Sequence, residues 1–102
     1  MDYKDLNNPE EYIGKKVRLE GYVSDMPWQH LIDFSDEYPE INYIDCDKEQ
    51  IVVYTKGPIM CESKVRIEGI LKKVAGESKR PGSEEVYYEY QIVGETFECI
   101  ED

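Results

Sequence analysis

The chain has 102 residues, which is the length of one small domain, and we expect a single domain over 1–102. Its 23 acidic and 12 basic residues give a formal net charge of −11. Such a field repels phosphate backbones unless a local basic stripe acts within about 8–10 Å. The sequence has no apolar run long enough to span a membrane and no signal-peptide pattern, so we expect no membrane association and a cytoplasmic location.

The N-terminal residues predict a short helical turn. Asn8 suits the N-cap, Pro9 suits the first helical position, and Glu11 lies three residues after the cap. Gly14 is expected to end the turn in the left-handed conformation. The apolar side chains expected to pack from this turn against the rest of the domain are Leu6, Tyr12 and Ile13.

A strand pattern occurs twice in the chain. KVRLEG at 16–21 recurs as KVRIEG at 64–69, and each copy alternates charged and apolar residues before a glycine. Alternation predicts half-buried strands, and a glycine inside such a strand indicates a bulge or a tight bend. Val17, Leu19 and Val23 are expected to point inward. Two long, bent strands in so short a chain favour a small closed β-barrel.

The remaining elements follow from alternation and from turn residues. Residues 25–40 lack alternation, so we expect a short helix or an ordered loop there. Segment 59–63 leaves room for one helical turn at most, and 96–100 either extends the last strand or wraps the barrel. The predicted strands are 15–24, 41–47, 50–56, 64–74 and 86–93, with a tight turn at 48–49 and an exposed, mobile loop at 75–85.

The cysteines are expected to be reduced. Cys46, Cys61 and Cys99 are far apart in the sequence, odd in number and without a C-x-x-C pair. This spacing argues against a disulfide framework and against a zinc site. We therefore expect small, buried apolar side chains at these positions.

The segment DLNNPEEYIGKKVRLEGYV at 5–23 resembles the opening of small bacterial and archaeal OB-fold domains. Segments 51–58 and 64–71 are similar in pattern to the OB-like haem chaperone of cytochrome c maturation. The haem role does not carry over, because the only histidine here, His30, lies in the wrong region. The resemblance, over about 5–93, implies an all-β fold: a five-stranded OB-like Greek-key barrel with a short N-terminal helical turn and a possible short helix between its first two strands.

The resemblance also implies a binding function. OB-fold domains bind single-stranded nucleic acids, oligosaccharides or proteins on strands two and three and on the flanking loops. Aromatic side chains there stack on bases with little base specificity, so we expect a non-catalytic module that binds single-stranded nucleic acid and needs no cofactor or metal. The candidate ligand-binding residues are Arg18, Tyr22, Trp28, Tyr43, Tyr54, Lys56, Lys79 and Arg80.

Acidic residues favour a second hypothesis, in which an acidic face binds a basic partner protein or an exposed strand edge pairs with a partner strand. Carboxylates crowd 25–40, where phosphates would meet repulsion. The basic residues of the repeated strands form either a phosphate track or a ladder of cross-strand ion pairs. These residues are Lys16, Arg18, Lys64, Arg66, Lys72 and Lys73.

Some candidate residues also have a purely structural interpretation. Trp28, Leu31, Ile32 and Phe34 would plug one end of the barrel, and the tyrosines at 87, 88 and 90 would simply pack on a strand. The acidic clusters at 33–37 and 45–47 are expected to be solvated surface carboxylates rather than a cation site. Catalysis has little support, because no Ser-His or Cys-His neighbourhood and no phosphate loop is present.

Overall fold

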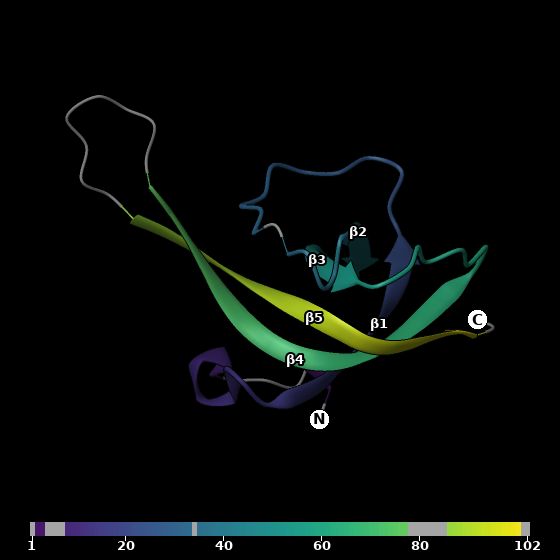
Figure 1. The fold of residues 1–102 in the computed structure, drawn as a ribbon. Helices are drawn as coiled ribbons and strands as arrows, with labels where there is room; N and C mark the ends of the chain where they lie inside the picture. Colours follow the sequence, from purple (N-terminus) through teal and green to yellow (C-terminus); the bar gives the residue numbers. More distant parts are fainter. Residues whose placement is uncertain (1, 4–7, 34, 78–85, 101–102) are drawn as a thin grey trace.

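The computed structural model describes residues 2–3, 8–33, 35–77 and 86–100 and consists mostly of strands (Figure 1). A 3-10 turn, η2, precedes five strands that form one sheet, and the sheet closes into a ring in the order β1-β2-β3-β5-β4. The β3–β5 pair is parallel and the other pairs are antiparallel. The elements are η2 (Pro9–Tyr12), β1 (Lys16–Val23), β2 (Glu40–Cys46), β3 (Glu49–Thr55), β4 (Lys64–Glu77) and β5 (Val86–Ile100).

The predicted strands are present, and β1, β2 and β3 differ from expectation by one residue at each end. β4 continues to Glu77, so the loop predicted at 75–85 begins later, and 78–85 lie outside the described residues. β5 runs to Ile100, so 96–100 extends the strand. The tight turn is at 47–48, where Asp47 has φ 59°, and no helix forms at 25–33, 35–39 or 59–63.

The core fills the interior of the ring. Val17 and Leu19 of β1 are buried as predicted, and Val23 is partly buried against them. Tyr12 packs on this core from η2, whereas Ile13 is exposed and that prediction is wrong. Leu6 lies outside the described residues. The core residues are Val17, Leu19, Ile44, Cys46, Ile51, Val53, Ile59, Val65, Ile67, Leu71 and Ile92.

Glycines allow close contacts between neighbouring strands. A Cβ atom on Gly69 would overlap with the backbone of Val93, and the β4–β5 register shifts between Glu68 and Gly69, which confirms the predicted bulge there. Gly21 instead pairs regularly with β4, and a Cβ atom would overlap with the backbone of Asp45 on β2. Gly14 has φ 83° and ends the N-terminal turn as expected.

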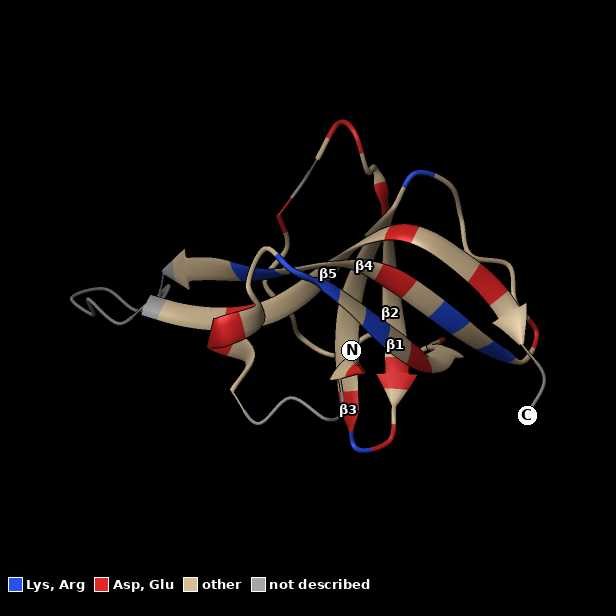
Figure 2. Cartoon of the chain, turned by 90° about the horizontal axis from the view of Figure 1, so that it is seen from below, with Lys and Arg blue, Asp and Glu red and all other residues tan. Residues whose placement is uncertain are grey.

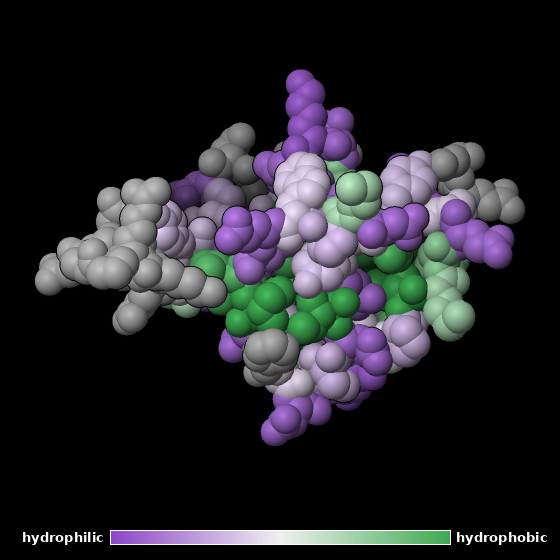
Figure 3. Space-filling model, turned by 90° about the horizontal axis from the view of Figure 1, so that it is seen from above, coloured by the Kyte–Doolittle hydropathy of each residue, from purple (hydrophilic) through white to green (hydrophobic). Residues whose placement is uncertain are grey.

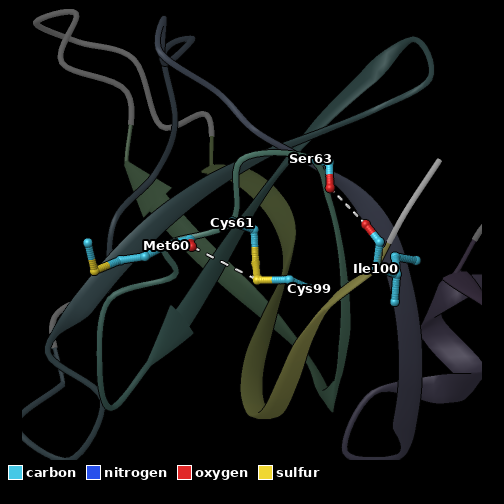
Figure 4. The surroundings of a disulfide bond; sticks show 5 residues. All are labelled: Met60, Cys61, Ser63, Cys99 and Ile100. Carbon is cyan, nitrogen blue, oxygen red and sulfur yellow. Dashed lines mark hydrogen bonds between the residues drawn. A yellow bond between two sulfur atoms is a disulfide. The ribbon is translucent and has the colours of Figure 1, made fainter.

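A disulfide joins Cys61, in the β3–β4 connection, to Cys99 near the end of β5, with Cα atoms 5.4 Å apart (Figure 4). The expectation that these cysteines are reduced is wrong. Closure of the ring pairs Lys64 with Ile100 and so brings the two cysteines together, which sequence spacing does not reveal. Cys46 is buried, as expected, and forms no disulfide. None of the described segments forms a helix long and apolar enough to cross a membrane.

Candidate binding site

The β1–β2 connection covers the outer face of β3 (Figure 1). Ile51 and Val53 point into the core, so by strand alternation Tyr54 points outward, yet its side chain is only 1% exposed. Leu31 of the connection also contacts β4 at Gly76. From Gln50 to Thr55 β3 is buried, so the outer face that was predicted to bind a ligand is covered.

Gln50 is the main attachment point of this connection. Its Oε1 atom accepts hydrogen bonds from the Trp28 backbone N–H (2.7 Å) and from Nε2 of His30 (2.8 Å). Its Nε2 group donates to Asp45 Oδ1 (2.8 Å) and to Ser24 Oγ (3.1 Å). The amide orientation is therefore fixed by its partners, and His30 must carry a hydrogen on Nε2.

His30 bridges β3 to β5. Its Nδ1 atom lies 2.9 Å from Oε2 of Glu89, and its side chain is 6% exposed. The same Glu89 oxygen accepts a hydrogen bond from Nε2 of Gln91 (2.7 Å). The His30 ring thus lies between the Gln50 amide on β3 and the Glu89 carboxylate on β5.

Tyr54 joins the same network further along the strand. Its hydroxyl accepts a hydrogen bond from the Asp33 backbone N–H (2.9 Å) and donates to Gln91. Nζ of Lys72 lies 4.1 Å from the Tyr54 ring centroid and 2.9 Å from Oδ2 of Asp33. Burial raises the pKa of the Tyr54 hydroxyl. The ring predicted to stack on bases is thus enclosed by the chain's own side chains.

An open groove of about 320 Å³ lies between the N-terminal ends of β3 and β5. The two strands pair only at Val53–Ile92 and Tyr54–Val93, so the sheet is not closed at this end. We call this surface the Trp28 groove. Its aromatic side chains are Tyr3, Trp28, Tyr88 and Tyr90, and its charged side chains are Lys48, Glu49 and Glu89.

The aromatic side chains of the Trp28 groove differ in exposure. Trp28 and Tyr88 are 57% and 60% exposed, so Trp28 does not plug the barrel and Tyr88 is not a packing residue. Tyr3 and Tyr90 pack against the core. Burial, with the charge of Glu49, raises the pKa of Tyr3 to about 12.

Glu10 connects η2 to this end of β5. Its Oε1 atom accepts hydrogen bonds from Lys73 and from the Tyr90 hydroxyl (2.8 Å). The Lys73 contact lowers the pKa of Glu10, and the hydrogen bond to Glu10 raises the pKa of Tyr90. Nζ of Lys73 lies 4.2 Å from the Tyr88 ring centroid. The charge of Lys73 beside Tyr88 is therefore already compensated.

The predicted site residues do not form one surface. Tyr43 lies beside His30, with ring centroids 5.6 Å apart, and Lys56 lies over the ring of Tyr38. Tyr22 is exposed on β1, and Arg18 is bound to Asp2 (2.7 Å). Lys79 and Arg80 lie outside the described residues. Of the described members, Trp28 alone lines the groove.

Within the described part of the chain, five of the six basic residues predicted to form a stripe on β1 and β4 form ion pairs, and Lys64 is the exception. Arg66 contacts Glu20 (3.2 Å) and Glu98 (3.0 Å). Figure 2 shows acidic and basic bands lying side by side on this part of the sheet. Arg66 joins β4 to carboxylates on both neighbouring strands, as the ladder interpretation predicts, and Lys16 contacts Glu95 on β5. The other pairs, Arg18–Asp2, Lys72–Asp33 and Lys73–Glu10, use carboxylates that lie outside the strands.

Sequence reasoning missed Tyr3, Lys48, Tyr88 and Tyr90 as groove residues. The spacing of Tyr88 and Tyr90 places both on one face of β5, which was the available signal. Among the described residues, no group of three or more His, Cys, Asp or Glu side chains could hold a metal ion. No protein-family model matches the chain, and no curated protein matches it significantly.

Proposed function

We propose that the protein is a non-catalytic binding module of the OB type that recognises a basic region of a partner protein. The strand order β1-β2-β3-β5-β4, the parallel β3–β5 pair and the register shift at Gly69 of β4 support the OB-type assignment. The observation that carries the choice of ligand is the burial of the outer face of β3 by the chain's own acidic connection.

Charge supports a basic partner. Asp25, Asp36, Glu37 and Glu40 are exposed on or beside the β1–β2 connection and form no ion pair with any described residue. Most described cations, by contrast, are already bound to carboxylates. A surface of uncompensated carboxylates attracts a basic protein and repels a phosphate backbone.

The exposed aromatic rings favour one second candidate. Trp28 and Tyr88 lie in one groove with Lys48, and aromatic rings beside a cation can stack on unpaired bases. Single-stranded nucleic acid, bound with little base specificity, is therefore the alternative ligand.

An amide chemical-shift titration separates the two ligands. The labelled protein is titrated with protamine, an arginine-rich polypeptide, and separately with oligothymidylate, both at about 0.15 M salt so that weak surface attraction is screened. We expect saturable chemical-shift changes with protamine and none with oligothymidylate. Saturable shifts with oligothymidylate would overturn the proposal in favour of the second candidate, and silence with both would overturn both.

A further inference from the structure

Trp28 is a large aromatic side chain that is exposed and yet anchored. Its backbone N–H donates to the buried Gln50 side chain, which is itself held by Asp45 and Ser24. The indole ring nevertheless remains 57% exposed in the groove. An aromatic residue on an anchored backbone loses little conformational freedom on binding, which is a property of residues that dominate binding energy.

The walls around Trp28 combine aromatic and acidic groups. Tyr88 is also mostly exposed, with Lys73 over its ring, and the charged side chains that line the groove are Glu49, Glu89 and Lys48. Glu49 forms no ion pair with any described residue. Both described hydrogen bonds of Glu89 use Oε2, toward His30 and Gln91.

These groups select a planar cation. An arginine guanidinium stacks on aromatic faces and pairs with carboxylates in the same plane, whereas a lysine ammonium is a compact, strongly hydrated charge. A phosphate would meet Glu49 and Glu89. Resting on the proposed function, we propose that the Trp28 groove binds an arginine side chain of the basic partner protein.

The single tryptophan provides a direct measurement. The probe is the peptide acetyl-GSPRPRSG-amide, and its control carries the neutral isostere citrulline at each arginine. We expect the arginine peptide to change Trp28 fluorescence saturably, and the citrulline peptide to bind about tenfold or more weakly, as loss of a cation–π contact and an ion pair implies. Equal affinity for both peptides would overturn the proposal.

Two matched pairs of variants locate the site. Glu49→Gln is expected to weaken binding of the arginine peptide about three- to tenfold. Glu62 is an exposed carboxylate on the β3–β4 connection, and Glu62→Gln is expected to leave binding unchanged. Trp28→Ala is expected to weaken binding of the peptide about tenfold or more, as measured by amide chemical shifts. Met60→Ala, which removes an exposed apolar side chain elsewhere, is the control and is expected to leave binding unchanged. Equal effects within either pair would overturn the proposal.

The outcomes separate this inference from the proposed function. Protamine binding whose amide shifts avoid Trp28, Tyr88 and Glu49 would overturn the groove assignment and leave the acidic-surface function standing. Absence of binding by protamine and by the arginine peptide would overturn both. Oligothymidylate that changes Trp28 fluorescence and competes with the arginine peptide would assign the groove to nucleic acid instead.

Discussion

Gln50 is the residue through which the sheet holds the β1–β2 connection. An uncharged amide supplies acceptor and donor groups at once, so one side chain accepts from Trp28 and His30 and donates to Ser24 and Asp45. A carboxylate in its place would have no donors for Asp45. This pairing explains why a polar side chain lies almost fully buried on the outer face of β3.

Gln50→Ala is expected to lower the free energy of unfolding by about 1–3 kcal/mol, because it leaves the Trp28 N–H and one His30 nitrogen without their partner. Urea denaturation followed by circular dichroism measures the change. Gln29→Ala is the matched control, because Gln29 is exposed on the same connection, and its effect is expected to stay within about 0.5 kcal/mol. A similar loss in both variants would contradict the attachment role of Gln50.

At the scale of elements, local pattern predicted the strands and long-range contacts decided the rest. Alternation identifies β1 almost to the residue because one of its faces lies in the core, and turn residues delimit β2 and β3 equally closely. The apolar residues of the connection at 24–39 show no regular spacing. Hydrogen bonds with the side chains of Gln50, Tyr54 and Gln91 hold this connection in place instead. Its position over β3, and hence the burial of Tyr54, depends on contacts between distant residues that no local pattern encodes.

The close contact at Gly69 predicts that one added methyl group destabilises the fold strongly. In Gly69→Ala the added Cβ would overlap with the backbone of Val93, which cannot move without separating β4 from β5. We expect a loss of at least about 1–3 kcal/mol in unfolding free energy, measured by urea denaturation. Gly57→Ala is the control, since no atom lies within 4 Å of the added Cβ, and it is expected to be neutral within about 0.5 kcal/mol. A neutral Gly69→Ala would show that the strands are not in close contact there.

At the scale of the whole molecule, ring closure explains features that lie far apart in the sequence. The β4–β5 pairing brings Cys99 beside Cys61 and Ile100 beside Ser63, whose Oγ donates to the Ile100 carbonyl (2.9 Å). The same closure leaves β3 and β5 separate at their N-terminal ends and so forms the Trp28 groove. The disulfide thus fastens the end of the β4–β5 pair that carries the chain's last described residues.

The disulfide is expected to contribute about 2–4 kcal/mol to stability, because it closes a loop across a sequence separation of 38 residues in the unfolded chain. The variant that carries Cys61→Ser and Cys99→Ser should unfold at a lower urea concentration, with a free energy of unfolding that is lower by about 2–4 kcal/mol. Dithiothreitol should lower the free energy of unfolding of the native protein by the same amount. The double variant is the control for the reductant, since Cys46 forms no disulfide and dithiothreitol should leave it unchanged. A native protein that is insensitive to reductant, with thiol titration showing that reduction is complete, would mean that ring pairing alone holds this end of the sheet.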